Sequence, residues 1–222
     1  MTRNILYKSY STKFGTLKAK PPLAFAGQRI GLLGGSFNPP HAAHILISNT
    51  VYRRLGLDAV WWIVSPGNPL KSHHELELFK NRVDLCRTLA SHPKIKATSF
   101  EGNLSTPYST VTISFLKQRY PAVKFVWLMG ADNLATFHMW HDWEGIVRKV
   151  PIAVVGRPGW HLQSLAGQTA KLMARYYIPE FKSQVLMAKQ PPVWTFLTGK
   201  QSVLSSTIIR MKRGGMLMNK TS

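Results

Sequence analysis

Residues 29–44 read Arg29-Ile30-Gly31-Leu32-Leu33-Gly34-Gly35-Ser36-Phe37-Asn38-Pro39-Pro40-His41-Ala42-Ala43-His44. The run begins with apolar residues and reaches paired glycines, which is typical of a buried strand in a parallel sheet. From His41 to Leu55 the apolar spacing is helical, with two prolines just before it and Gly56 just past its end. This stretch therefore predicts a strand, a glycine-rich loop and a helix, the first unit of an α/β fold.

The same alternation continues along the chain. We expect further strands over 60–64, 95–100, 124–129, 150–155 and 193–197, and helices over 76–90 and 110–119. Strands that alternate with helices predict an α/β fold with a Rossmann-like, doubly wound parallel sheet and helices on both faces. Ligands bind such sheets beyond the carboxyl ends of the strands. We therefore expect the functional site in the loops that begin at Gly34, Ser65 and Gly130.

The composition describes a globular and strongly basic protein. Of 222 residues, 45% are hydrophobic, which is enough for a sizeable core and excludes a disordered or fibrous chain. The chain has 29 Lys and Arg against 9 Asp and Glu, a formal net charge of +20. A net positive charge of this size attracts nucleic acid, phosphorylated metabolites or an acidic membrane surface. Composition does not choose among these three partners.

A single cysteine, Cys86, excludes a disulfide scaffold. We expect it to be a small core residue of a cytoplasmic protein. The sequence has no apolar run long enough for a membrane span, so we expect no membrane segment. It leaves both a monomer and a homo-oligomer open.

Both ends of the chain are expected to lie outside the folded domain. Residues 1–28 are basic and rich in Ser, Thr and Tyr, and they show no stable periodicity, so we expect a flexible tail. A transit-like targeting peptide is the alternative, because such peptides are also basic and poor in acids. We expect one domain over 29–215, a short C-terminal tail over 216–222, and little loss of stability or turnover when residues 1–27 are deleted.

The loop after the first strand has the chemistry of a phosphate site. Gly34 and Gly35 let backbone N–H groups approach a phosphate without a Cβ in the way. The N-terminus of the following helix presents further amides and its positive dipole end. His41 and His44 are three residues apart and share a face of the first turn, where they can donate hydrogen bonds to charge that develops in nucleotidyl transfer.

Other phosphate and metal motifs are excluded by their spacing. A dinucleotide fingerprint needs G-x-G-x-x-G, a P-loop needs G-x-x-x-x-G-K-[ST], and a zinc-protease helix needs H-E-x-x-H; none is present. The two histidines could also be zinc ligands or ordinary core residues, but no third ligand accompanies them. We therefore expect no metal site made by protein residues.

The pattern Gly-Gly-Ser-Phe-Asn-Pro-Pro-His-x-x-His resembles the H-x-G-H-type signature of nucleotidyltransferases related to class I tRNA synthetases. Their second signature has a counterpart in Leu204-Ser205-Ser206-Thr207-Ile208-Ile209-Arg210. There the hydroxyls and free amides of a helix start can hold a second phosphate, and Arg210 adds a cation. A helix cap alone would mean little, but the pair of motifs at opposite ends of one domain is specific.

Three further segments resemble nicotinate-nucleotide adenylyltransferases. These are Gly130-Ala131-Asp132 through Trp140, Gly156-Arg157-Pro158-Gly159, and Tyr108-Ser109-Thr110-Val111-Thr112. The resemblance covers roughly residues 28–214. Ser109 stands where this family usually has Thr, and Val111 where an acidic or amide residue is common. Both departures fall in the segment that would contact the mononucleotide.

The resemblance implies adenylyl transfer from ATP to nicotinic acid mononucleotide, with Mg²⁺ held mainly by the phosphates. His41, His44 and Arg210 would be catalytic. The implied ATP-binding residues are Gly34, Gly35, Ser36, Phe37, His41, His44, Lys71, Gly130, Asp132, Ser205, Ser206, Thr207 and Arg210. The implied mononucleotide-binding residues are Tyr108, Ser109, Thr110, Trp140, Arg157 and Trp194.

Some of these assignments have ordinary structural alternatives. Asp132 could accept hydrogen bonds from a ribose or be a plain loop acid, and Lys71 could reach a phosphate or be a solvated lysine. Trp140 and Trp194 could line the site or pack in the core. At the level of function, phosphopantetheine adenylyltransferases and cytidylyltransferases share the first motif. A basic nucleic-acid-binding protein is the alternative from another class, but it would not explain two phosphate motifs.

Overall fold

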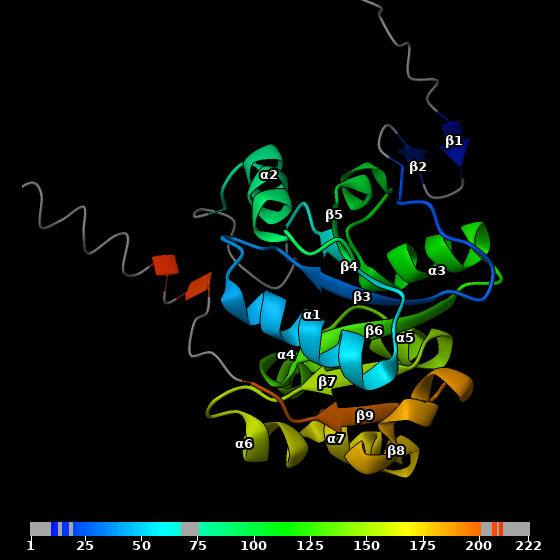
Figure 1. Cartoon of the computed structure of the whole chain (residues 1–222), viewed down its shortest axis with the longest axis vertical. Coiled ribbons are helices and arrows are strands. Elements are labelled where there is room, and N and C mark those ends of the chain that lie inside the picture. Colours follow the sequence, from blue (N-terminus) through cyan, green and yellow to red (C-terminus); the bar gives the residue numbers. More distant parts are fainter. Residues whose placement is uncertain are drawn as a thin grey trace, which may run out of the picture.

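The computed structural model describes residues 10–12, 15–17, 20–67, 76–200, 206, 207, 209 and 210. A seven-stranded, wholly parallel sheet crosses the domain in the order β5-β4-β3-β6-β7-β9-β8 (Figure 1). Its strands are β3 (Arg29–Gly35), β4 (Ala59–Val64), β5 (Ile95–Thr98), β6 (Lys124–Gly130), β7 (Ile152–Val155), β8 (Tyr177–Ile178) and β9 (Trp194–Leu197).

The strand order reverses direction at β3, which lies between β4 and β6. Register pairs Leu32 with Trp127, so the glycines that end β3 lie beside the carboxyl end of β6. This is the topological switch point, where a parallel sheet leaves a crevice for a ligand. The switch point therefore lies at the loops where the sequence predicts the functional site.

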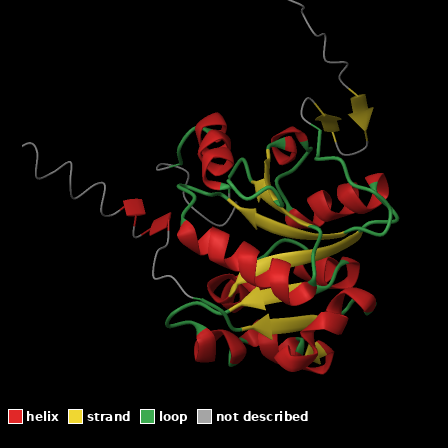
Figure 2. Ribbon diagram, viewed as in Figure 1, coloured by secondary structure: helices red, strands yellow, loops and turns green. Residues whose placement is uncertain are grey.

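Helices cover both faces of the sheet, as Figure 2 shows. The helices are α1 (Ala42–Leu55), α2 (Phe79–Leu89), α3 (Ser109–Arg119), α4 (Ala131–Thr136), α5 (Trp143–Lys149), α6 (His161–Leu165) and α7 (Gln168–Leu172), with 3-10 helices η1 (Phe100–Asn103), η2 (Phe137–Met139), η3 (Ala174–Tyr176) and η4 (Glu180–Ala188). Helices α1, α2 and η4 bury apolar residues on one face, and α3, α4, α5 and α7 on the other. Trp61 and Trp62, adjacent in β4, point into opposite cores. The doubly wound prediction is confirmed.

The strands begin and end close to their predicted positions, and the largest omissions lie between β7 and β9. There the structure contains α6, α7, η3, β8 and η4, which are short elements with weak periodicity. Strand β5 ends at Thr98, before residue 100, because η1 begins at Phe100. Gly56 ends α1 in the left-handed conformation with φ 59°, the role predicted for it. Within the described residues, no helix is both long and apolar enough to cross a membrane.

The segment before β3 takes part in the fold, contrary to our expectation of a wholly free tail. Strands β1 (Tyr10–Thr12) and β2 (Gly15–Leu17) form an antiparallel pair. Pro21 is buried, Tyr120 Oη donates a hydrogen bond of 3.0 Å to the Pro22 carbonyl, and Gly27 N donates one of 2.8 Å to Ala122 O. Sequence periodicity could not reveal these contacts, because they are made by single residues and by the backbone.

We now expect deletion of residues 1–27 to lower stability. Losing the two hydrogen bonds to Pro22 O and from Gly27 N should cost about 2 kcal/mol, which corresponds to a fall in Tm of roughly 4–8 °C for a domain of this size. The measurement is thermal unfolding of the truncated and full-length chains. Tyr120→Phe, which removes one of the two bonds, should lower Tm by about half as much. An unchanged Tm in the truncated chain would show that residues 1–27 add no stability, as expected of a free tail.

Candidate active site

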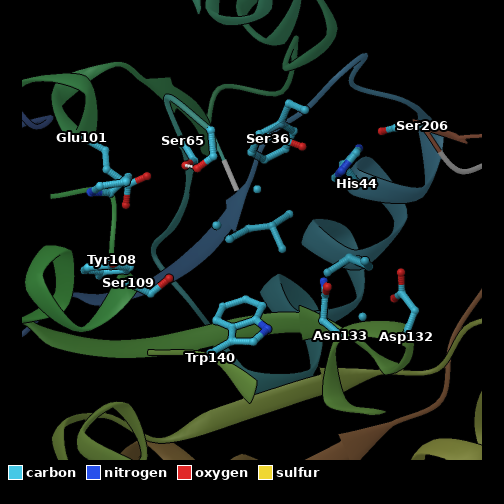
Figure 3. Close-up of a pocket in the computed structure, with 18 of the residues that line it drawn as sticks. Ser36, His44, Ser65, Glu101, Tyr108, Ser109, Asp132, Asn133, Trp140 and Ser206 are labelled. Carbon is cyan, nitrogen blue, oxygen red and sulfur yellow. Dashed lines mark hydrogen bonds between the residues drawn. The ribbon is translucent and has the colours of Figure 1, made fainter. Parts of the chain in front are cut away.

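A cavity of about 440 Å³ opens at the switch point, within the usual size range of small-molecule sites. Its wall comes from the loops after β3, β4 and β6, with further residues from the starts of α1, α3 and α4 (Figure 3). The sequence-predicted residues that line it are Gly34, Gly35, Ser36, Phe37, His41, His44, Tyr108, Ser109, Gly130, Asp132, Trp140, Arg157, Ser206 and Thr207. The fold thus gathers most of the predicted residues around one space.

The histidine pair lies at the N-terminus of α1. His41 is the N-cap residue, and its ring centroid is 4.0 Å from that of His44. The backbone N–H of His41 donates a 3.1 Å hydrogen bond to His44 Nδ1, so the neutral His44 ring carries its proton on Nε2. Phe37, buried and with φ 47°, packs against the His44 ring at 4.6 Å. The His44 ring is therefore held by contacts on two sides.

Both histidines are neutral at pH 7 in the free protein. Burial, with a smaller contribution from the nearby Arg157 charge, lowers the pKa of His41 to about 4. Burial, the neighbouring His41 and Arg157 lower the pKa of His44 well below its ordinary value. The pair can therefore donate hydrogen bonds to a phosphate without adding a fixed charge. A bound polyphosphate would favour the protonated forms and raise both pKa values.

Asp132 and Arg157 form an ion pair beside the histidines. Asp132 is in the first turn of α4, and its Oδ2 accepts a 3.0 Å hydrogen bond from Arg157 Nη1. Within the described chain, Asp132 Oδ1 and His41 Nδ1 are buried without a hydrogen-bond partner. A buried polar atom of this kind needs a partner, and a bound substrate can supply one. A Cβ on Gly130 would collide with Asp132 Oδ1 and with the Arg157 Cδ at 2.9 Å, so a larger residue here would displace the side chains of this ion pair.

The C-terminal motif meets the first motif, although more than 160 residues separate them. Ser206 Oγ donates a 2.9 Å hydrogen bond to Pro39 O, and Arg210 Nη1 donates one of 2.7 Å to Asn38 O. Arg210 thus braces the loop before α1 and does not line the cavity itself. Two further predicted residues, Lys71 and Ser205, lie outside the described residues.

Aromatic side chains line the other end of the cavity. Trp140 is half-buried and meets the rings of Phe137 and Trp127 edge-on, at 5.3 and 6.4 Å. Tyr108, the N-cap residue of α3, stacks on His141 at 4.1 Å with an interplanar angle of 23°. Figure 3 shows Tyr108, Ser109 and Trp140 on one side of the cavity and His44 with Ser206 on the opposite side. This end offers flat apolar surfaces next to a helix N-terminus.

The structure directs the side chains of three residues assigned to the mononucleotide elsewhere. Trp194 is buried in the core, where its Nε1 donates a 2.8 Å hydrogen bond to Met173 O; packing was the alternative, and it is what the structure shows. Thr110 is buried too, and its Oγ1 donates to Asp142 and accepts from Lys149, so its side chain links α3 to α5. Arg157 lines the cavity, but next to the histidine pair.

Comparisons with known proteins identify the family of the chain. The cytidylyltransferase-like family model matches residues 32–212. Proteins named probable nicotinate-nucleotide adenylyltransferase are 47% identical in Agrobacterium fabrum, over 82% of this chain and 97% of theirs, and 47% identical in Methylorubrum extorquens, over 83% and 100%. This chain belongs to the nicotinate-nucleotide adenylyltransferase family. Its fold also matches the solved structure of Plasmodium falciparum nicotinic acid mononucleotide adenylyltransferase complexed with NaAD, at 18% identity, with a TM-score of 0.62 and 83% of each chain covered.

The cavity wall also contains residues to which the sequence analysis assigned no role. They are Leu33, Ile47, Ser65, Gly67, Glu101, Pro107, Asn133, Met139 and His141. Glu101 is the most unusual, because it is a buried acid in the cavity wall. Its Oε1 accepts a hydrogen bond from Thr112 Oγ1, and burial raises its pKa to about 7. A sequence signal existed: no other acidic residue occurs between Glu101 and Asp132.

Glu101→Gln should make the stability of this adenylyltransferase less sensitive to pH. The folded pKa of about 7 lies above the ordinary 4.5, so the folded state binds more protons than the unfolded state between these values. The carboxyl's contribution is therefore full below pH 4.5 and is lost as the pH rises to 7. At about 1.4 kcal/mol per pKa unit, the loss is on the order of 3 kcal/mol.

The test is urea unfolding of both proteins at pH 5 and pH 8. The variant should gain stability relative to the wild type as the pH rises. His41 acts in the opposite direction over this range, but it is present in both proteins and cancels in the comparison. A difference between the two proteins that stays constant with pH would show that Glu101 is ionised throughout.

Proposed function

We propose that the chain transfers the adenylyl group of ATP to nicotinic acid mononucleotide, giving nicotinic acid adenine dinucleotide and pyrophosphate. The observation that carries this proposal is the two-ended cavity. One end has the neutral His41–His44 pair at a helix N-terminus, and the other has Tyr108 and Trp140. The names of the relatives, at 47% identity and nearly full length, support the same reaction.

The proposed chemistry is a direct in-line displacement. A phosphate oxygen of the mononucleotide attacks the α-phosphorus of ATP and forms a new P–O bond. The bond from that phosphorus to the bridging oxygen breaks, and its electron pair leaves with pyrophosphate. No covalent enzyme intermediate or strong base is needed, so catalysis reduces to positioning and charge stabilisation.

Each part of the cavity then has a role in this displacement. His41 and His44 donate hydrogen bonds to the charge that develops on the transferred phosphate. The glycine-rich loop after β3 lets the phosphates approach the backbone. Arg157 contributes positive charge and orients Asp132, whose unpartnered Oδ1 accepts a ribose hydroxyl. Arg210 supports the loop before α1.

We propose that Mg²⁺ arrives with ATP and is held mainly by its phosphates. The carboxylates that line the cavity fit that assignment. Asp132 is already paired with Arg157, and Glu101 accepts a hydrogen bond from Thr112, so neither is a ready metal ligand. Magnesium prefers phosphate and water oxygens with few protein ligands. When bound, it neutralises charge on the phosphates.

The acceptor end favours the acid over the amide mononucleotide. The N–H groups of Ser109 and Thr110, at the start of α3, donate to no acceptor within the described chain. Free amides at a helix N-terminus suit a carboxylate, whereas an amide NH₂ group would face donors. Stacking on Trp140 would hold the pyridine ring beside them.

The proposal is tested by incubating the pure protein with ATP, Mg²⁺ and single acceptors and measuring pyrophosphate release. Turnover with phosphopantetheine, or with CTP in place of ATP, would point to the related transferases. Salt-dependent binding of nucleic acid without turnover would point to the binding-protein alternative.

We keep the cytoplasm as the proposed location, since Cys86 is a buried free thiol. Gel filtration of the same preparation decides between a monomer and a homo-oligomer.

A further inference from the structure

Arg82 is a buried arginine whose hydrogen bonds go to backbone carbonyls. It lies in the first turn of α2 and is 1% exposed. Its Nη1 donates to Ser36 O and Ser65 O, its Nη2 to Pro66 O, and its Nε to Glu77 O, at 2.5 to 2.9 Å. Burying a guanidinium is costly unless its donors are satisfied. A buried arginine at position 82 therefore needs a role beyond packing.

The carbonyls that Arg82 holds belong to the loops after β3 and β4, which both border the cavity. In a trans peptide the C=O and N–H bonds point in opposite directions. Binding of Ser36 O and Pro66 O by Arg82 therefore turns the N–H groups of Phe37 and Gly67 away from the guanidinium.

Phe37 and Gly67 both line the cavity, and neither N–H donates to another residue in the described part of the chain. Phe37 also has a positive φ of 47°, a conformation that a bulky residue keeps only when its surroundings impose it. A backbone hydrogen bond of 2.9 Å from Ser65 N to Gly35 O also joins the two loops directly. The arrangement is a pair of oriented donors braced from behind by a cation.

We propose that Arg82 is a positioning residue for phosphate binding, which fixes the Phe37 and Gly67 amides so that they donate to a phosphate group of a substrate. The inference rests on the proposed function for the identity of the substrates. Lysine could not replace Arg82, because one ammonium group cannot reach four carbonyls in the fixed geometry of a guanidinium. Both ATP and the mononucleotide carry such a phosphate, and the experiment distinguishes them.

The test compares ligands with and without phosphate. Calorimetry measures binding of ATP and adenosine, and of nicotinic acid mononucleotide and its nucleoside, to the wild type, to Arg82→Lys and to Arg87→Lys. Arg87 is exposed on the same helix and pairs with Asp84, so it is the matched control. We expect Arg82→Lys to bind ATP, the mononucleotide or both at least tenfold more weakly, with both phosphate-free ligands within about twofold of wild type. The pair that responds identifies the phosphate.

Equal losses for the phosphorylated and phosphate-free members of each pair would reduce Arg82 to a structural residue and overturn the proposal. So would unchanged binding of all four ligands. If Arg82→Lys does not fold, ¹⁵N spectra of the wild type decide: the Phe37 and Gly67 amide resonances should shift on addition of ATP or of the mononucleotide, and resonances that do not move contradict the proposal. Turnover of the wild type tests the proposed function separately, so the two failures are distinguishable.

Discussion

Replacing His44 with alanine should lower kcat by about two to three orders of magnitude, the usual cost of losing a preorganised donor at a developing negative charge. The His44 ring is positioned by its Nδ1 bond from His41 N and by Phe37, so Nε2–H donates from a fixed place. His41→Ala should have an effect of similar size. The measurement is steady-state pyrophosphate release with both substrates saturating.

Both alanine variants should keep the fold. His44→Ala places alanine in the first turn of α1, where it is favourable, and His41→Ala removes a ring whose Nδ1 has no hydrogen-bond partner among the described residues. The matched control is His92→Ala, which removes an exposed histidine outside the cavity and should leave kcat unchanged. Equal melting temperatures would show that the loss is catalytic. Near-wild-type turnover in either variant would remove the histidine pair from the transition state.

Trp140→Ala should raise the KM of the mononucleotide by roughly tenfold or more while the KM of ATP stays nearly unchanged. Stacking of a base on an aromatic ring contributes about 1–3 kcal/mol, and the half-buried Trp140 indole lines the cavity. The acid and amide mononucleotides should weaken together, because both contain the pyridine ring. Trp140→Phe should recover part of the loss.

Trp160→Ala is the control for this effect. Trp160 precedes α6 and is 38% exposed, and it does not line the cavity. It should leave both KM values as they are. Equal increases in the KM of ATP and of the mononucleotide for Trp140→Ala would assign Trp140 to the packing of η2 against Trp127.

Sequence reasoning predicted the elements that carry strong local signals. The glycine loop, the His41–His44 spacing and the apolar strands are local patterns, and the structure has them where expected. The family resemblance also predicted residues of the site that are distant in the sequence, such as Ser206, which donates a hydrogen bond to Pro39 O. Segments with weak periodicity, such as 156–193, could not be predicted in detail.

The residues that sequence reasoning missed depend on tertiary contacts. Arg82 occupies a helix where an arginine is normally solvated, and only the folded chain brings the Ser36 and Ser65 carbonyls to it. Glu101 becomes unusual because η1 buries it beside Thr112. Trp194 shows the converse error: the residue type suits a ligand wall, but β9 directs the side chain into the core.

The most direct test of the account is a competition assay with ATP, Mg²⁺ and equal concentrations of the acid and amide mononucleotides, with the dinucleotide products quantified by mass spectrometry. We expect nicotinic acid adenine dinucleotide as the main product, with kcat/KM for the acid at least about tenfold higher, or roughly 1.4 kcal/mol. Equal use of both would contradict the acid-selective reading of the α3 N-terminus. Formation of neither dinucleotide would contradict adenylyl transfer at this site.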